Sequence, residues 1–325
     1  MTHDGAGVVT LGETMALLTP DGRLVAGSSL RVGIGGAESN TAIGLARLGC
    51  DATWIGRVGD DDLGTAVLRE IRAEGVRVLA DRDPEAPTGV MLKEMRGGRP
   101  RRVRYYRSTS AAARWRPDDL DGVADRIAGA RVLHLTGITP ALGPGPLEVV
   151  RRAITIARRA GVEVTLDVNH RRALWTDERA REVLAGLLPD VGVLLAGAEE
   201  AAMLLGRADG AETVERGTEL AAGLAGLGPP TVVVKLGELG AVADGEGGPL
   251  HLPTRPVEVV DPVGAGDAFA AGLLAARLDG LSAAEQIALG NACGGAVCRE
   301  PGDWEGLPTR EDLARGGVGD AAIVR

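Results

Sequence analysis

The sequence predicts an α/β fold in which helices cover both faces of a mostly parallel central sheet. After residue 131, short apolar segments alternate with longer segments whose apolar residues recur at helical spacing. This alternation is typical of βαβ units, whose strands run parallel and are buried on both sides. Before residue 110, stretches of alternating polarity predict a second, smaller sheet. The strands expected in the second half are 132–136, 162–166, 191–196 and 231–236, and the helices are 147–160, 178–187, 199–205 and 213–227.

The composition excludes several classes of protein. The 325 residues are 45% hydrophobic but only 2% aromatic, so the chain can bury a large core built from Ala, Leu, Val and Ile. A formal charge of −9 argues against nucleic acid or a membrane surface as partner. The longest uncharged run, 132–147, holds three prolines and three glycines and does not predict a membrane helix. Three cysteines without a CxxC pair predict a cytoplasmic protein with reduced thiols.

The N-terminal part is expected to mix strands with two helices. A buried strand is predicted at 8–11, and alternating stretches at 15–18 and 30–34 flank a turn. A helix at 41–48 ends at a glycine. A strand at 53–59 leads into three aspartates, which we expect to cap a helix at 66–73 rather than to bind a cation.

Two further strands, 88–94 and 103–108, are joined by a turn rich in glycine and arginine. With the earlier alternating stretches they predict a small β lid, inserted from about 14–34 and 88–108 into one domain that spans 1–325. Solvation at a hairpin tip explains most of these arginines. Tyr105 and Tyr106 are the only tyrosines of the chain. Neighbouring strand residues face opposite sides, so one tyrosine can face a site while the other packs or contacts a partner.

The most specific stretch runs from Asp261 to Gly272 and has the sequence DPVGAGDAFAAG. The apolar run 257–260 predicts a strand before it, and 268–278 predicts a helix after it. A glycine turn that opens a helix lets backbone amides and the helix dipole bind an anion. Asp267 stands at the lip of this turn, where its carboxylate would repel a phosphate but suits a base for an attacking hydroxyl. The alternative is a helix cap.

Two strings resemble the signatures of the ribokinase-like (PfkB) carbohydrate kinases. DPVGAGDAFAAG resembles the second signature, and GGAESNTAIGLARLG at 35–49 resembles the first. The resemblance covers about 12–309 and implies a ribokinase-like three-layer sandwich with a mostly parallel central sheet and a small β-sheet lid. It implies that Asp267 is the catalytic base and that Gly264, Ala265 and Gly266 form the anion hole. It also implies sugar contacts at Gly35, Gly36 and Asn40, although a glycine pair can also simply precede a helix.

A third string, DVNHR at 167–171, follows a predicted strand at its carboxyl end, where open α/β sheets bind ligands. Arg171 offers a planar guanidinium that matches a carboxylate or a phosphate, and a loop ion pair is the alternative. With the following Leu174-Trp175, the string resembles the DxNxR…LW element of fructokinase-like and 2-keto-3-deoxygluconate kinases. The resemblance implies substrate contacts at Asn169 and Arg171. Tyr105 and Arg107 of the YYR string are the further candidates for substrate binding.

The nucleotide is expected at the end of another predicted strand. Lys235, Gly237 and Gly240 belong to the string KLGELG, whose glycines allow a close approach of backbone to a nucleotide. The resemblance adds Gly264, Gly266 and Asn291, although a helix-surface amide explains Asn291 equally well. It also assigns Glu200 to organising magnesium and phosphates. In this chain Gly197 replaces the Asn that usually precedes that glutamate by three positions.

The resemblance implies an ATP-dependent kinase of a sugar acid, with Mg²⁺ and a monovalent cation as cofactors and a homo-oligomer formed through the lid. Four strings favour the 2-keto-3-deoxygluconate kinase branch: DPVGAGD, YYR followed by Ser110-Ala111, GAEE, and the tail GDWEGLP. Met91 departs from that branch, which commonly carries Tyr there. A fructokinase-like enzyme for a neutral sugar is the alternative. A dinucleotide oxidoreductase is disfavoured because no GxGxxG follows the first strand, and Asp267 with its glycine turn argues against a catalytically silent sugar sensor.

Overall fold

The main sheet is nine-stranded and mostly parallel. A computed structural model of the chain describes residues 7–96 and 99–316. The strand order is β13-β12-β11-β10-β9-β8-β1-β4-β5, and only the β11–β12 and β12–β13 pairs are antiparallel. The predicted α/β class is therefore confirmed. The strands are β1 (Val8–Leu11), β4 (Ala52–Gly59), β5 (Arg77–Asp83), β8 (Val132–Thr136), β9 (Glu163–Asp167), β10 (Val193–Gly197), β11 (Thr231–Lys235), β12 (Ala241–Asp244) and β13 (Leu250–Leu252).

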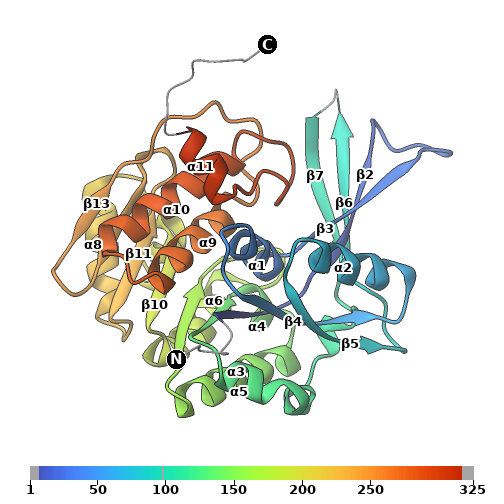
Figure 1. Cartoon of the computed structure of the whole chain (residues 1–325), viewed down its shortest axis with the longest axis horizontal. Helices are drawn as coiled ribbons and strands as arrows, with labels where there is room; N and C mark the ends of the chain where they lie inside the picture. Colours follow the sequence, from blue (N-terminus) through green and yellow to red (C-terminus); the bar gives the residue numbers. More distant parts are fainter. Residues whose placement is uncertain (1–6, 97–98, 317–325) are drawn as a thin grey trace.

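Helices cover both faces of this sheet (Figure 1). A cluster around Trp54 packs one face against α1 (Ala37–Arg47), α2 (Asp62–Ala73), α9 (Ala265–Leu278) and α10 (Ala283–Val297). A cluster around Trp115 packs the other face against α5 (Pro144–Arg159), α6 (Asp177–Ala185), α7 (Ala198–Leu204) and α8 (Val214–Ala225). Aliphatic residues dominate both clusters, as the composition predicted. The short helices are α3 (Ala124–Ala128), α4 (Ile138–Ala141) and α11 (Arg310–Gly316), and the 3₁₀ turns are Ala112–Arg114, Pro117–Val123, Leu188–Asp190 and Gly237–Leu239. Over 7–96 and 99–316, no helix has the length and apolarity needed to span a membrane.

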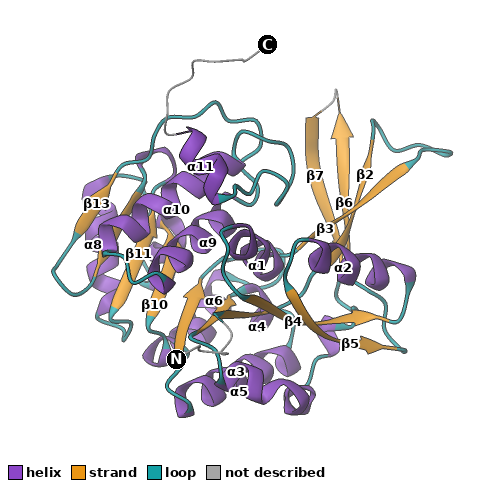
Figure 2. Ribbon diagram, viewed as in Figure 1, coloured by secondary structure: helices purple, strands orange, loops and turns teal. Residues whose placement is uncertain are grey.

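A second sheet, which we call the lid, projects from one side of the main body (Figure 2). Its order is β3-β2-β6-β7, from β2 (Met15–Pro20), β3 (Leu30–Gly35), β6 (Val90–Arg96) and β7 (Arg99–Tyr106). Met91 pairs with Leu17 on one side and with Tyr105 on the other. Cross-strand partners share a face, so these side chains lie on what we call the inner face. Lys93 lies two positions beyond Met91 and shares that face.

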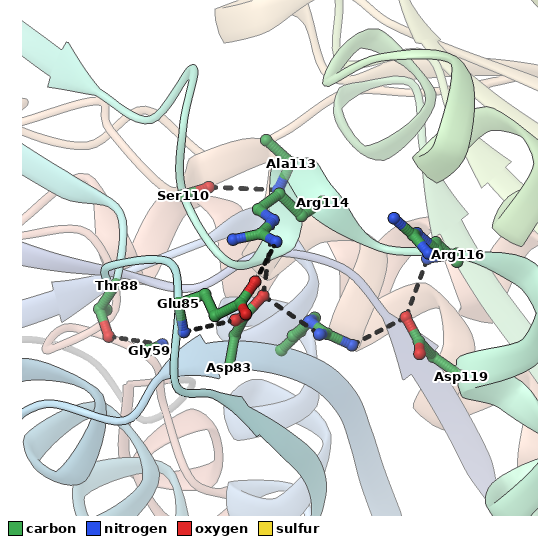
Figure 3. A network of polar contacts seen from close by, with 10 residues as sticks. Gly59, Asp83, Glu85, Thr88, Ser110, Ala113, Arg114, Arg116 and Asp119 are labelled. Carbon is green, nitrogen blue, oxygen red and sulfur yellow. Dashed lines mark hydrogen bonds and ion pairs between the residues drawn. The ribbon is translucent and has the colours of Figure 1, made fainter.

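A polar network fixes the base of the lid where the chain passes from β5 to β6 (Figure 3). Arg57 bridges Asp83 at 3.1 Å and Asp119 at 2.8 Å, and Asp83 also accepts the backbone N–H of Glu85. Arg114 donates to Glu85 at 2.8 Å (Figure 3). Asp83 is almost fully buried, so these donors offset the cost of burying its charge. These contacts therefore hold the segment between β5 and β6, where the chain enters the lid, in a fixed position on the main body.

Local structure departs from the sequence expectations near the C-terminal half of the sheet. The strand expected at 257–260 does not form, because β13 ends at Leu252 and the following segment finds no sheet partner. Val259 and Val260 are accordingly more than half exposed. The helix expected from residue 268 begins three residues earlier, at Ala265. β5, β12 and β13 were not predicted. The cap expected from the three aspartates is present, since Asp61 accepts the N–H of Gly64 at 2.7 Å.

Candidate active site

Asp267 lies in the first turn of α9, beside backbone amides that have no partner within the helix. Gly264 caps the helix with a φ of 80°, a left-handed backbone conformation that favours glycine. Any Cβ at this position would collide with the carbonyl oxygen of Asp303. The early start of α9 places Ala265, Gly266 and Asp267 together at the positive end of the helix dipole. This turn can therefore bind an anion next to the Asp267 carboxylate.

Two amide side chains hold that carboxylate. Asn40 Nδ2 on α1 donates to Oδ2 at 2.9 Å, and Asn169 Nδ2 donates to Oδ1 at 3.3 Å. Burial raises the pKa of Asp267 to about 7. The Asn40 hydrogen bond opposes this rise, and the charge of Asp167 adds to it. The nearby charges of Arg171 and Lys235 lower the pKa. Asp267 can thus exchange a proton near neutral pH.

Asn169 is held in a strained backbone conformation. Its φ of 38° makes it the single non-glycine residue with positive φ among 7–96 and 99–316, and Asn tolerates this region better than most residues. The loop is fixed by its neighbours. Lys235 Nζ donates to both carboxylate oxygens of Asp167, at 2.7 and 3.0 Å, and Glu200 Oε1 accepts the backbone N–H of His170 at 2.7 Å. The ends of β9, β10 and β11 therefore combine to aim Asn169 at Asp267.

A cavity of about 930 Å³ opens between this edge of the main sheet and the lid. Gly35 and Gly36 lie on the wall of this cavity, at positions that have no room for a side chain. A Cβ at position 35 would lie 2.8 Å from Oδ2 of Asp303 and collide with Met91, and a Cβ at position 36 would collide with the Glu13 carbonyl. The predicted residues that line the cavity are Gly35, Gly36, Asn40, Tyr105, Arg107, Arg171, Gly264 and Asp267. Asn169 adjoins the cavity through its hydrogen bond to Asp267, and Ala265 and Gly266 lie in the turn between the two lining residues Gly264 and Asp267.

The two tyrosines lie on opposite faces of the lid. Tyr105 lines the cavity, and Tyr106 lies on the outer face with 62% of its surface exposed. Arg107 is nearly buried and pairs with Glu13, Nε to Oε2 at 2.6 Å. Ser110 donates to the other oxygen of Glu13 at 2.5 Å. Arg107 therefore brings a charge to the cavity wall that Glu13 has already neutralised.

Arg171 differs from Arg107, because no hydrogen bond or ion pair engages its side chain within the part of the chain that the structure describes. It is exposed at the cavity mouth. Arg172 lies beside it but donates to Asp177 at 3.4 Å, and Arg104 on the lid pairs with Glu94 at 2.9 Å. A substrate anion in the cavity would thus meet an arginine with all of its donors available.

The sequence reasoning missed two acidic residues of the cavity wall. Glu13 lies two residues past the end of the first strand, so the rule that ligands bind beyond the carboxyl ends of strands could have found it. Asp303 lies in the loop between α10 and α11, inside the string GDWEGLP, which served only to indicate the kinase branch and to which no site role was given. Asp303 is 8% exposed, and its Oδ1 accepts from Lys93 Nζ of the lid at 3.0 Å. Burial raises the pKa of Asp303, and the charge of Lys93 opposes the rise.

The residues expected to bind nucleotide fall into two groups. Lys235 lies beside the anion-binding turn, with Nζ 3.4 Å from the position that a Cβ would take on Gly266. Burial alone would lower the pKa of Lys235, but the carboxylates of Asp167, Glu200 and Asp267 outweigh it and raise the pKa.

In the second group, Asn291 Nδ2 donates to the Leu252 carbonyl at 3.1 Å, and Gly240, with φ of 88°, packs on that same carbonyl. Gly237 precedes it with φ of 54°. Asn291 also lines a cavity of about 1150 Å³ formed by 253–260, α10 and 305–313.

Both carboxylate oxygens of Glu200 bind backbone amides. Oε1 accepts from His170 and Oε2 accepts from Gly197, each at 2.7 Å, so Glu200 caps α7. In the residues that the structure covers, no three His, Cys, Asp or Glu side chains lie close enough together to form a metal site. These residues therefore do not form a dedicated metal cage, and a Mg²⁺ ion here would depend on phosphate oxygens and water for most of its ligands.

This geometry agrees with the comparisons to known proteins. Residues 6–310 match the pfkB family carbohydrate kinase model. The chain is 38% identical to the 2-dehydro-3-deoxygluconokinase of Bacillus subtilis (strain 168), with 94% of each chain covered. It is 35% identical to the 2-dehydro-3-deoxygalactonokinase of Haloferax volcanii, with 98% of this chain and 99% of the relative covered. A crystal structure of a 2-dehydro-3-deoxygluconokinase from Thermotoga maritima superposes with a TM-score of 0.86 at 29% identity, covering 98% of this chain and all of the other. The fold is therefore ribokinase-like.

The raised pKa of Asp267 makes a prediction about stability. The pKa is about 7 in the folded protein and 3.8 in the reference state, so the stability that protonated Asp267 contributes is lost as the pH rises through 7. Asp267→Asn should therefore unfold with a higher free energy than wild type at pH 8, by roughly 2–4 kcal/mol, and with a similar one at pH 4.

Urea unfolding at the two pH values measures this difference. Asp118→Asn, at a carboxylate with 93% of its side chain exposed, is the control and should show no such gain. An Asp267→Asn variant whose stability relative to wild type is the same at pH 4 and pH 8 would contradict the raised pKa.

Proposed function

This chain belongs to the pfkB family of carbohydrate kinases and is a sugar kinase, and we propose that it transfers a phosphoryl group from ATP to a hydroxyl of 2-keto-3-deoxygluconate or a related sugar acid. The likeness to kinases of 2-dehydro-3-deoxy sugar acids over nearly the whole chain supports this substrate class. The single observation that carries the acid assignment is the unengaged guanidinium of Arg171 at the cavity mouth. Leaving an unpaired arginine beside a neutral sugar would waste the cost of desolvating it.

In the proposed reaction, Asp267 accepts the proton of the attacking sugar hydroxyl. The hydroxyl oxygen bonds to the γ-phosphorus while the bond from that phosphorus to the bridging oxygen of ADP breaks, and ADP leaves with the electron pair. The amides of Gly264, Ala265, Gly266 and Asp267 would stabilise the charge on the transferring group. Of the carboxylates that line the cavity, Glu13 and Asp303 each have a cation within 3.0 Å, whereas within the described residues the Asp267 carboxylate accepts only from neutral amides. This difference favours Asp267 as the base.

The remaining predicted residues keep their roles as parts of the proposal. The substrate contacts are Gly35, Gly36, Asn40, Tyr105, Arg107, Asn169 and Arg171, and the nucleotide contacts are Lys235, Gly237, Gly240, Gly264, Gly266 and Asn291. ATP is the phosphoryl donor, and Mg²⁺ neutralises phosphate charge when it enters with the nucleotide. Glu200, whose oxygens hold two backbone amides, would act on the metal through the position of its loop. A monovalent cation is a further proposed requirement.

We also propose one kinase domain, 1–325, with its lid at about 14–34 and 88–108, that forms a homo-oligomer through the outer face of the lid. Leu30, Val32 and Tyr106 support this interface because they lie on that face and are 38%, 53% and 62% exposed. A cytoplasmic location completes the proposal, since it supplies ATP and keeps the free thiols of Cys50, Cys293 and Cys298 reduced.

A substrate panel tests the function. With ATP and Mg²⁺, release of ADP should be fastest with 2-keto-3-deoxygluconate or its galacto epimer, and slower with fructose, ribose and nucleosides. The runner-up, a fructokinase-like enzyme for a neutral sugar, predicts the highest kcat/KM for fructose. That result would reject the sugar-acid assignment while leaving the kinase assignment intact.

Arg171 should determine the preference for an acid. Arg171→Ala should raise the KM of the acid substrate by about 10- to 100-fold, since a charged hydrogen bond contributes roughly 1.5–3 kcal/mol, and should change the KM of ATP far less. Arg179→Ala, which removes an exposed arginine paired with Glu182 on α6, is the matched control and should match wild type. Equal changes in both KM values for Arg171→Ala would assign the residue to the nucleotide or to the fold.

Met91 should influence the choice among acids. It is 5% exposed and lines the cavity, with its methyl group directly over Gly35. A tyrosine at this position, common in 2-keto-3-deoxygluconate kinases, adds a hydroxyl. Met91→Tyr should raise kcat/KM for 2-keto-3-deoxygluconate relative to a rival acid or neutral sugar by about 2- to 12-fold, equivalent to one neutral hydrogen bond. Met91→Phe adds a ring without the hydroxyl and should not raise this ratio. An unchanged ratio for Met91→Tyr would mean that position 91 does not contact the substrate.

A further inference from the structure

The Lys93–Asp303 ion pair joins the lid to the C-terminal part of the chain across 210 residues of sequence. Lys93 lies on the inner face of β6 and Asp303 in the segment 302–307, which we call the strap. The side chains are only 10% and 11% exposed, and Nζ lies 3.0 Å from Oδ1. Removing two charges from water costs free energy, so the position of this buried pair calls for an explanation other than stability. The surroundings of Asp303 supply one.

The second oxygen of Asp303 remains available to the cavity. Oδ2 lies directly over Gly35, which has no side chain to cover it, and no hydrogen bond from 7–96 or 99–316 engages it. Asp303 and Gly35 both line the cavity, whereas Lys93 does not. The ion pair therefore leaves one carboxylate oxygen bound to the lid and the other facing the substrate space, where a sugar hydroxyl could donate to it.

The backbone of the strap is held by contacts that do not involve Lys93. Trp304 Nε1 donates to the Ile34 carbonyl at 3.2 Å, and Arg47 stacks over the Trp304 ring at 5.3 Å. Arg47 also donates to the carbonyls of Glu305 and Leu307, at 3.0 and 2.8 Å. The Asp303 carbonyl packs directly on Gly264 of the anion-binding turn. Removing Lys93 would thus free the Asp303 carboxylate without releasing the strap.

From this arrangement we infer that Lys93 is a positioning residue for the sugar site: it fixes the Asp303 carboxylate so that Oδ2 accepts a substrate hydroxyl while the lid lies over the cavity. Because Lys93 belongs to the lid and Asp303 to the body, the contact makes sugar affinity depend on the lid position. The inference rests on the proposed function only in taking the substrate as a sugar with a hydroxyl to donate, and it does not depend on the acid group.

Steady-state kinetics of a small set of variants tests this inference. Lys93→Met keeps the length of the side chain and removes its charge. It should raise the KM of the sugar by about 10- to 100-fold, the effect of one charged hydrogen bond, and change the KM of ATP less than about threefold. Lys93→Arg restores a cation and should recover most of the affinity. Arg31→Met is the matched control, because it removes a lid cation from the exposed ion pair with Asp21, neither of which lines the cavity, and it should keep the wild-type KM.

A double-mutant cycle separates positioning from any independent effect of Lys93. Asp303→Asn alone should raise the KM of the sugar, and Lys93→Met should add less than about threefold in that background, since its action depends on the Asp303 carboxylate. The double variant also lacks the uncompensated charge that destabilises Lys93→Met, so it remains measurable if the single variant folds poorly. Additive effects, a sugar KM in folded Lys93→Met within threefold of wild type, or an equal loss in Arg31→Met would overturn the inference.

The assay uses whichever sugar the wild-type enzyme phosphorylates best. If that sugar is neutral, the sugar-acid proposal fails, yet the Lys93 comparison proceeds unchanged with the neutral substrate. Failure of the sugar-acid proposal is therefore distinguishable from failure of the inference about Lys93.

Discussion

The arrangement of the site depends on keeping one carboxylate, that of Asp267, buried at the N-terminus of α9. Burial disfavours its charged form and raises its pKa to about 7. The amides of Asn40 and Asn169 and the positive end of the helix dipole make the charged form tolerable. These donors come from α1 and from the end of β9, so two helices and a strand must meet at one point. The glycines at 35, 36 and 264 are required there because any Cβ would collide with a neighbour or crowd it.

The other carboxylates around the cavity are each given a partner. Asp167 binds Lys235, Glu13 binds Arg107, and Asp303 binds Lys93, while Glu200 accepts two backbone amides. Such pairing holds these side chains in fixed positions. Among the described residues neither Asp267 nor Glu200 has a cation at hydrogen-bond distance, but Asp267 lines the cavity and Glu200 does not. No ion pair or hydrogen bond from residues 7–96 or 99–316 engages the Arg171 side chain, so the site combines a group suited to remove a proton with an arginine available to bind an anion. The paired residues thus hold the site in place, and Asp267 and Arg171 remain available to act on the substrate.

Much of the fold and of the anion-binding turn could be predicted from the sequence, because short local patterns of residues specify them. The alternation of apolar strands with helices specified the parallel sheet, and the string DPVGAGD specified a glycine turn that opens a helix. The failures have physical causes. The run 257–260 is β-branched and looks like a strand, but strand formation needs a neighbour with free hydrogen-bonding groups, which no local pattern reveals. Asp303 and its partner Lys93 are 210 residues apart, and Glu13 meets Arg107 across 94 residues. Contacts of this kind depend on how the lid and the strap pack, and one sequence carries no sign of them.

The most direct test of the central claim is the pH dependence of kcat/KM for the sugar, in wild type and in Asp267→Asn. If Asp267 is the base and has a pKa of about 7, the wild-type value should fall about tenfold per pH unit below neutrality, because the protonated carboxyl cannot accept a proton. In Asp267→Asn, turnover should be lower by roughly 10²- to 10⁴-fold, the usual scale for a lost general base. The fall of kcat/KM below neutral pH should also be absent from this variant. A wild-type profile that stays flat from pH 5 to pH 8, or an Asp267→Asn variant that turns over within a few-fold of wild type, would contradict the account.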